Sequence, residues 1–260
     1  MTANCPLTLD NVKVCNTYEL FLEVAGAEAR LRVRFPTTSQ STIITGERFP
    51  LITMSYAQLS AEARNVVAMF TQATTLEVEN GCNWYPEAHQ IAYKLGKRFN
   101  VSTNQAAGVI AALSPLNEWS RNVLNAETML KAWNHGTAED AVNVKCSTPP
   151  LNKEKAVRII QDTGEPIDQI LNGPKVTEFF NCITRPDMND VCIDGHAYCI
   201  FMGIRLALKD VPAIGKRLRQ RIKQDYRDAT AFINEELGEN YLAAQIQAIT
   251  WVTYKRIHNV

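Results

Sequence analysis

The segment Ala106-Ala107-Gly108-Val109-Ile110-Ala111-Ala112-Leu113 is the longest uninterrupted apolar run in the chain. Ser102-Thr103-Asn104-Gln105 precedes it and matches a capping box, in which serine and glutamine side chains satisfy amides at a helix start. Ser114-Pro115 ends the helix, because proline cannot continue it. A helix that is apolar on every side is expected at the centre of a helical body. The run is too short to span a bilayer, so we expect no membrane association.

Helical patterns flank this run on both sides. Before it, Pro86 suits the first position of a helix whose apolar residues recur every three or four positions. After it, similar apolar stripes fall within residues 123–133, 153–160, 176–183, 200–204 and 242–252. The sequence therefore predicts a mainly α-helical domain over residues 51–260.

The first fifty residues have a different pattern. Arg30-Leu31-Arg32-Val33-Arg34-Phe35 alternates between arginine and apolar residues, which is typical of a β-strand. Residues 18–24 form a matching partner strand, with Gly26 in the turn. The arginines indicate either a solvated strand face or a phosphate-facing one. We predict a small β-rich N-terminal appendage over residues 1–50, with a boundary near Pro50.

Composition and cysteine placement narrow the class of protein. The 260-residue chain has a formal net charge of zero, so binding to nucleic acid must come from local basic patches. Its seven cysteines form no C-x-x-C pair and show no iron–sulfur spacing, so the sequence predicts neither a zinc site nor an iron–sulfur cluster. No other cofactor is indicated. The N-terminus lacks the basic and apolar regions of a signal peptide. These features predict a cytoplasmic protein with free thiols.

Lys175 and Asp194 are the candidate catalytic residues. Each lies at a predicted helix start, and they are 19 residues apart (194 − 175 = 19). A lysine attacks carbon only as the neutral amine, and the positive end of a helix dipole disfavours the charged form. A carboxylate can accept the amine proton or stabilise positive charge at the anomeric carbon of a nucleoside. Equally, aspartate before a helix is a common N-cap, and lysine in a first turn is usually just exposed.

Four segments resemble the helix-hairpin-helix superfamily of DNA glycosylases, of which endonuclease III is a familiar member. Residues 106–114 resemble its central helix and the following turn, and Asn152-Lys153-Glu154-Lys155-Ala156 begins a match to its N-x-K-A-x-x-I helix. Gly173-Pro174-Lys175 is similar to the end of the hairpin and the nucleophilic lysine. Ile193-Asp194-Gly195-His196 resembles the V-D-T-H stretch with the catalytic aspartate. The matches follow the family's order between residues 85 and 205.

The chain departs from the family pattern in three places. The hairpin, expected as L-P-G-V-G-x-K, is shorter and has lost one glycine; Gly195 replaces threonine; and the iron–sulfur cysteines of endonuclease III are absent. The resemblance implies Lys175 as a Schiff-base nucleophile and Asp194 as its electrostatic partner, acting on a base flipped out of DNA. It also implies that Asn117 or Leu116, in the turn after the central helix, fills the gap left by that base.

Other residues are candidates for contacting the base or the DNA. Asn83-Trp84-Tyr85 combines stacking and hydrogen-bonding groups, although Asn83 could instead cap a helix on which the two aromatic residues pack. Trp119 is either a core residue or a stacking surface. Residues 216–223 carry five positive charges in eight residues, which suits either a phosphate contact or a solvated helix face. The predicted DNA and substrate contacts are Asn83, Trp84, Tyr85, Ser114, Asn117, Trp119, Gly173, His196, Lys216, Arg217 and Arg219.

Three functions fit these observations, and DNA is the expected partner of the first two. The first is a DNA glycosylase, with or without abasic-site lyase activity, that acts on a modified or damaged base. The second keeps the same fold but attaches amines or amino acids to thymine-type bases of viral DNA. The third is a noncatalytic module with a helix-hairpin-helix core that binds DNA or another partner.

Overall fold

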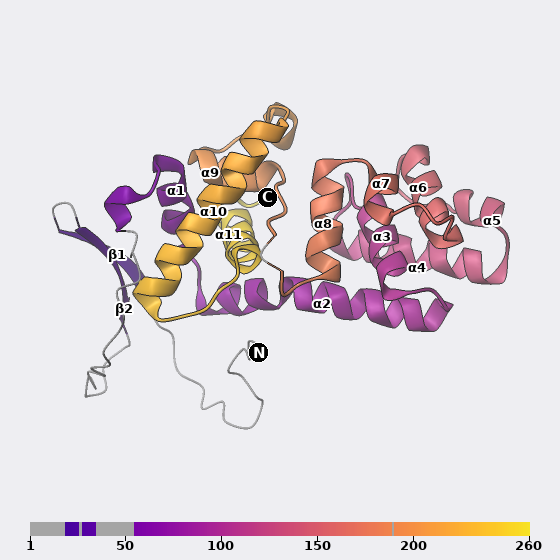
Figure 1. The fold of residues 1–260 in the computed structure, drawn as a ribbon, viewed down its shortest axis with the longest axis horizontal. Coiled ribbons are helices and arrows are strands. Elements are labelled where there is room, and N and C mark those ends of the chain that lie inside the picture. Colours follow the sequence, from indigo (N-terminus) through magenta and orange to yellow (C-terminus); the bar gives the residue numbers. More distant parts are fainter. Residues whose placement is uncertain (1–18, 26–27, 35–54, 189) are drawn as a thin grey trace, which may run out of the picture.

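The computed structural model describes residues 19–25, 28–34, 55–188 and 190–260. The fold of this part is mainly helical, as the sequence predicts (Figure 1). The helices are η1 (Tyr56–Gln58), α1 (Ala61–Phe70), α2 (Thr75–Phe99), α3 (Thr103–Leu113), α4 (Trp119–His135), α5 (Ala138–Val142), α6 (Pro150–Gln161), α7 (Ile167–Leu171), α8 (Pro174–Thr184), α9 (Gly195–Met202), η2 (Leu208–Asp210), α10 (Lys216–Leu237) and α11 (Ala243–His258).

Two strands precede the helices. β1 (Glu19–Ala25) and β2 (Glu28–Arg34) pair antiparallel, in the register that places Glu19 opposite Arg34 and Ala25 opposite Glu28. The remainder of the predicted appendage, including Gly26 and the boundary near Pro50, lies outside the described residues. The extent of a β-rich unit over residues 1–50 and the role of its arginines therefore stay predictions.

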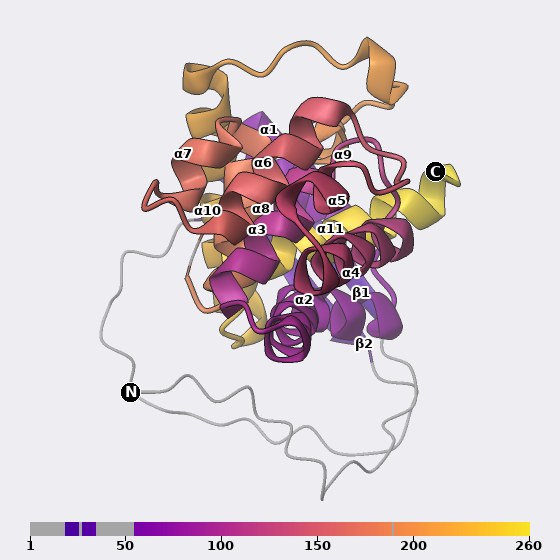
Figure 2. The same cartoon turned by 90° about the vertical axis from the view of Figure 1, so that its right-hand side faces the viewer.

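Helix α3 is central, which confirms the reading of the apolar run. All eight residues from Ala106 to Leu113 are buried. The helix packs against α2, α4, α6 and α8, which surround it in two perpendicular views (Figures 1 and 2). Its capping box is also confirmed, because Ser102 Oγ accepts from the Gln105 amide at 3.0 Å and Gln105 Oε1 accepts from the Ser102 amide at 2.8 Å. The central position of α3 thus agrees with its continuous apolar sequence.

Helix α2 corrects the prediction that a helix begins at Pro86. The helix begins at Thr75, eleven residues earlier (86 − 75 = 11), behind a capping box formed by Thr74 and Glu77. Proline in a helix interior cannot donate to the carbonyl four residues back, here that of Cys82. Gln245 Nε2 donates to that carbonyl at 3.3 Å and so replaces the missing bond. The predicted capping role of Asn83 is wrong for the same reason, since this exposed residue lies in mid-helix.

The helices form two groups that share α2 and one face of α11. One buried cluster lies among α2–α8 and includes Ala244 and Ala248 of α11, and the other lies among α1, α2, α9, α10 and α11. Figure 1 shows α2 running beneath both groups. Helix α11 approaches α2 closely at Gly81, where a Cβ atom would lie 2.6 Å from the Ile249 backbone. Residues 190–194, called here the connecting segment, continue from α8 of the first group to α9 of the second.

Candidate active site

A cavity of about 930 Å³ lies between the two groups of helices. Its walls come from α2, the turn between α3 and α4, α8, the start of α9 and α11. It brings together both predicted catalytic residues and six of the predicted contacts. These eight residues are Trp84, Tyr85, Ser114, Asn117, Trp119, Lys175, Asp194 and His196.

Lys175 occupies the first turn of α8, as the sequence predicts. Gly173 is the N-cap residue and Pro174 is the first helical residue. The preceding turn is short: Asn172, with φ 43°, adopts the left-handed conformation that ends α7. Lys155 Nζ secures this turn by donating to the Leu171 carbonyl at 2.6 Å. Lys175 itself is exposed at the cavity, and within the described part of the chain no carboxylate forms an ion pair with its amine.

Asp194 is the N-cap of α9, and both of its carboxylate oxygens are engaged. Oδ1 accepts from the Ala197 amide at 2.8 Å, and Oδ2 accepts from the indole nitrogen of Trp251 at 3.0 Å. The capping interpretation is therefore confirmed, and α11 adds a second constraint on the same side chain. Gly195 matters here, because a Cβ atom at this position would lie 2.7 Å from Leu208 Cδ2. Because glycine has no Cβ atom, Leu208 at the beginning of η2 can pack against the start of α9.

Aromatic rings form much of the cavity wall. The ring centroids of Trp84 and Trp251 are 5.2 Å apart, and those of Trp84 and Trp119 are 5.7 Å apart. Trp119 also meets Phe179 edge-on at 6.1 Å. Trp119 is half-buried, so it packs in the wall and also faces the cavity. Rings of this size offer flat apolar surfaces on which a planar ligand can stack.

The buried polar residues of the wall have unused hydrogen-bonding capacity. The Tyr85 hydroxyl donates to Gln247 Oε1 at 2.8 Å, and burial raises the pKa of Tyr85 well above its usual value, so the hydroxyl stays protonated. No described residue accepts a hydrogen bond from the Gln247 amide nitrogen. Asn122 Nδ2 donates to the Ile110 carbonyl at 3.1 Å, whereas its buried Oδ1 has no partner in the described chain. A buried polar atom without a protein partner, as Asn122 Oδ1 is here, is commonly satisfied by ordered water in folded proteins.

His196 lines the cavity, and its surroundings favour the neutral form of its ring. Burial is the main cause that lowers its pKa, and the charges of Lys255 and Lys175 act in the same direction, whereas Asp194 opposes them. The ring packs against Tyr254, with centroids 5.3 Å apart, and its buried Nδ1 has no partner among the described residues. A neutral imidazole can still accept or donate a proton.

The turn after α3 separates the two candidate wedge residues. Asn117 is engaged, because its Nδ2 donates to the Leu113 carbonyl at 2.8 Å and to Thr148 Oγ1 at 3.0 Å. Leu116 is 94% exposed and has a φ of 65°, in the left-handed region that side chains rarely adopt. Ser114 Oγ donates to the Ala111 carbonyl at 2.9 Å and so helps to close α3. Of the two candidates, Leu116 is thus the exposed one at the cavity rim.

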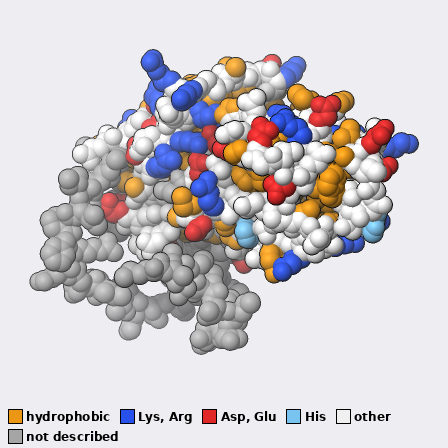
Figure 3. Space-filling model, turned by 45° about the vertical axis from the view of Figure 1, so that its right-hand side comes forward, with side chains coloured by type: hydrophobic (Ala, Val, Ile, Leu, Met, Phe, Trp, Pro, Cys, Tyr) orange, Lys and Arg blue, Asp and Glu red, His pale blue; other side chains and the backbone are white. Residues whose placement is uncertain are grey.

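The basic cluster of α10 is only partly exposed, which corrects the expected location of Arg219. Lys216 and Arg217 are exposed in the first turn, outside the cavity. Arg219 points inward: its side chain is 11% exposed and binds Glu178 at 2.6 Å. Lys223, one turn later, binds Asp190 at 2.6 Å. Figure 3 shows basic and acidic side chains interspersed on one face.

A search against known protein families gives one match, over residues 49–258, to a family of unknown function (DUF7178). The chain belongs to this family. The match includes every residue of the cavity wall. No curated protein and no solved structure matches the chain.

Two further observations accompany the family assignment. In the described part of this DUF7178 chain, no helix has the length and apolar character needed to cross a membrane. The same part contains no group of three or more histidine, cysteine, aspartate or glutamate residues that could hold a metal ion. Four of its cysteines, Cys146, Cys182, Cys192 and Cys199, are free thiols.

Sequence reasoning missed the contribution of α11 to the DUF7178 cavity. Gln247, Trp251 and Lys255 line it, at a spacing of four residues that places them on one helix face. Lys255 Nζ lies 4.5 Å from the centre of the Trp251 ring, a cation–π contact. The sequence signal for this face was the polar and aromatic stripe that these three residues form on an otherwise apolar helix. By contrast, predicted contacts Asn83, Gly173, Lys216, Arg217 and Arg219 do not line the cavity.

Proposed function

We propose that this protein is a DNA glycosylase of helix-hairpin-helix type, with Lys175 as the nucleophile and Asp194 as its partner. The observation that carries the proposal is that Lys175 and Asp194, 19 residues apart (194 − 175 = 19), line one cavity with aromatic walls. The succession of α7, the Asn172-Gly173 turn and α8 further supports it, since Lys175 lies directly after the turn, at the start of the second helix of this pair.

The chemistry proceeds by displacement at the anomeric carbon. The neutral Lys175 amine attacks C1′ of the sugar, and the bond from C1′ to the base breaks with its electron pair leaving on the base. The base takes up a proton, and the amine nitrogen releases one. Opening of the sugar ring then converts the adduct into a Schiff base. The Asp194 carboxylate stabilises positive charge at C1′ during this step, or accepts the amine proton.

The cavity wall suits a flipped base. Chemistry at C1′ requires the nucleotide to leave the stack, because the atom is not reachable inside a duplex. Trp84, Trp119 and Trp251 supply ring faces against which the base can lie. The amide nitrogen of Gln247, for which the described part of the chain offers no acceptor, is oriented by the bond from Tyr85 and is a hydrogen-bond donor for a carbonyl oxygen of that base.

Leu116 supports the DNA-binding part of the proposal. Base flipping leaves a gap, and an exposed apolar side chain can fill it by inserting between neighbouring bases. Leu116 is 94% exposed beside the cavity, whereas the Asn117 amide is held by its own chain. Exposed Lys216 and Arg217 are available for phosphate contacts.

A second candidate function, transfer of an amine or amino acid to a thymine-type base, is favoured by one observation. The cavity, at about 930 Å³, is at the upper end of the usual range for ligand pockets and leaves room beside a nucleotide. Lys255 is a further ammonium in that space, with no carboxylate partner in the described chain. Nucleoside mass spectrometry after incubation with modified DNA distinguishes the two, since a glycosylase releases the base and a transferase increases its mass.

Covalent trapping tests the glycosylase proposal without knowledge of the target base. The protein is mixed with duplex DNA carrying an abasic site, and borohydride reduces any Schiff base to a stable adduct. We expect an adduct with the wild type and with Lys255→Gln, which removes the other cavity ammonium, but none with Lys175→Gln. An adduct that persists in Lys175→Gln would contradict the role of Lys175.

A further inference from the structure

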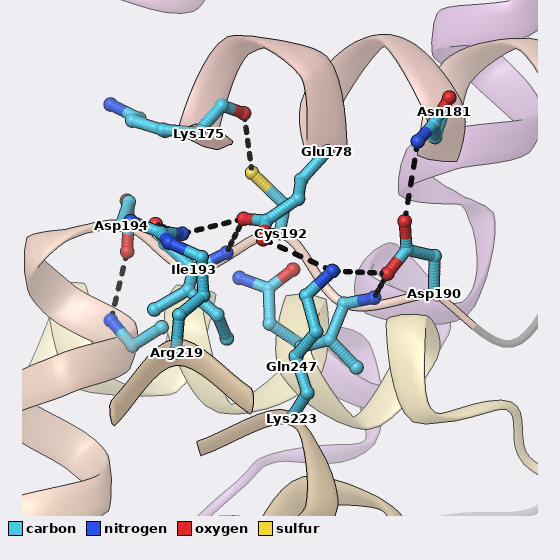
Figure 4. A network of polar contacts seen from close by, with 12 residues as sticks. Lys175, Glu178, Asn181, Asp190, Cys192, Ile193, Asp194, Arg219, Lys223 and Gln247 are labelled. Carbon is cyan, nitrogen blue, oxygen red and sulfur yellow. Dashed lines mark hydrogen bonds and ion pairs between the residues drawn. The ribbon is translucent and has the colours of Figure 1, made fainter. Parts of the chain in front are cut away.

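Ile193, the residue directly before Asp194, has both of its backbone groups held by side chains. Its amide donates to Glu178 Oε2 at 3.0 Å, and its carbonyl accepts from Arg219 Nη1 at 2.9 Å. Ile193 is fully buried, so these bonds do not compete with solvent. Figure 4 shows Glu178 descending from α8 and Arg219 rising from α10 to meet at this peptide.

Glu178 and Arg219 also bind each other. Arg219 Nη1 lies 2.6 Å from Glu178 Oε2, and the two side chains are only 11% and 8% exposed. A buried ion pair is an inefficient source of stability, because desolvation of both charges offsets their attraction. Its directional hydrogen bonds do, however, fix geometry. Here they fix the backbone of Ile193, which is bonded directly to Asp194.

The same pair is linked to Lys175. Glu178 lies three residues after Lys175 on α8, which places it one turn away (178 − 175 = 3). The thiol of Cys192 approaches the Lys175 carbonyl at 3.7 Å and ties the connecting segment to the start of the helix. We infer that Glu178 and Arg219 are positioning residues that hold the Asp194 carboxylate in place relative to the Lys175 amine. The effect on catalysis rests on the proposed function, whereas the placement of the Asp194 carboxylate by these two residues does not.

Lys223 provides a matched control. It binds Glu178 at 3.0 Å and Asp190 at 2.6 Å, in the same network as Arg219. No hydrogen bond joins it to Ile193 or Asp194 within the described chain. Arg219→Met and Lys223→Met therefore each leave Glu178 with one cation, but only Arg219→Met releases the Ile193 carbonyl.

The first test reads the position of Asp194 without any substrate. The Trp251 indole N–H donates to Asp194 Oδ2, so its ¹⁵N–¹H resonance reports movement of the carboxylate. Trp251→Phe assigns that resonance. We expect Arg219→Met to shift it and Lys223→Met to leave it in place. Arg219→Lys, which keeps the charge, should give a smaller shift of the same resonance. This variant replaces Arg219→Met in the test if Arg219→Met does not fold. An unmoved resonance in both Arg219 variants, or an equal shift in Lys223→Met, would overturn the inference.

The second test reads the consequence for chemistry. We expect Arg219→Met to slow borohydride trapping at saturating abasic DNA by about 10- to 100-fold, the usual effect of a misplaced catalytic group, with an unchanged Kd. In an Asp194→Asn background the same change should cause no further loss, since Arg219 acts through Asp194. A further loss there, or equal slowing by Lys223→Met, would contradict the positioning role. A wild type that traps nothing contradicts the proposed function alone, and the indole resonance then decides the inference.

Discussion

The indole nitrogen of Trp251 donates a hydrogen bond of 3.0 Å to Asp194 Oδ2, so α11 constrains the carboxylate that begins α9. The other oxygen caps α9 through the Ala197 amide. The carboxylate is therefore held from two helices before any ligand arrives. Such pre-organisation is what stabilisation of a developing charge requires.

Removing the indole donor should weaken catalysis more than folding. Trp251→Phe keeps an aromatic wall but loses the hydrogen bond to Asp194. Hydrogen bonds to charged groups contribute about 1.5–3 kcal/mol, so we expect at least a roughly tenfold slower trapping rate. Trp133→Phe, a half-buried tryptophan outside the cavity, is the control. Equal trapping rates for Trp251→Phe and wild type would show that this bond is dispensable.

Gln247→Met should separate base recognition from chemistry at the sugar. The substitution preserves volume but removes the amide donor and the acceptor used by Tyr85. We expect release of the target base to fall, because the donor for its carbonyl oxygen is gone. Trapping on abasic DNA, which has no base at the site, should be unchanged. Parallel loss in both assays would mean that Gln247 maintains the site as a whole.

Substitution of Leu116 by glycine should raise thermal stability but lower the affinity for DNA. Leu116→Gly relieves a left-handed backbone conformation, which costs a non-glycine residue roughly 1 kcal/mol, so thermal stability should rise. Affinity for DNA with a flippable base should fall, because the apolar side chain is lost. Leu124→Gly, on the exposed face of α4, tests for nonspecific effects. Affinity that survives in Leu116→Gly would contradict insertion of this side chain.

His196 predicts a loss of stability in mild acid. Its pKa is lowered from 6.5 in the folded protein, mainly by burial. Below pH 6.5 the unfolded chain therefore binds a proton more readily than the folded one, and the free energy of unfolding decreases as the pH falls. His196→Gln should flatten this slope in urea titrations between pH 7 and 5. The same change at exposed His135 is the control for effects of the substitution itself.

Local patterns predicted the elements that depend on local interactions. The apolar run of α3, its capping box, and the helix starts at Lys175 and Asp194 were all confirmed. Each depends on residues within a few positions of one another, where spacing in the sequence fixes spacing in the helix. The helical domain could therefore be predicted from residue 55 onward.

The errors arose where a distant residue changes the local outcome. Pro86 lies inside α2 because Gln245, 159 positions away (245 − 86 = 159), accommodates the helix around the missing bond. Arg219 turns inward because it donates hydrogen bonds to Glu178 and to the Ile193 carbonyl. No window of neighbouring residues contains these partners. The cavity face of α11 was missed because its apolar stripe, which packs on α2, dominates the pattern.

The most direct test of the central claim is to locate the lysine that forms the adduct in the unaltered protein. Wild-type protein is reduced with borohydride on abasic duplex DNA, digested, and mapped by mass spectrometry. Lys175 and Lys255 both line the cavity, so the measurement distinguishes two real candidates. We predict that the sugar remnant is attached to Lys175. Attachment to Lys255 or to any other amine, or the absence of an adduct, would contradict Lys175 as the nucleophile.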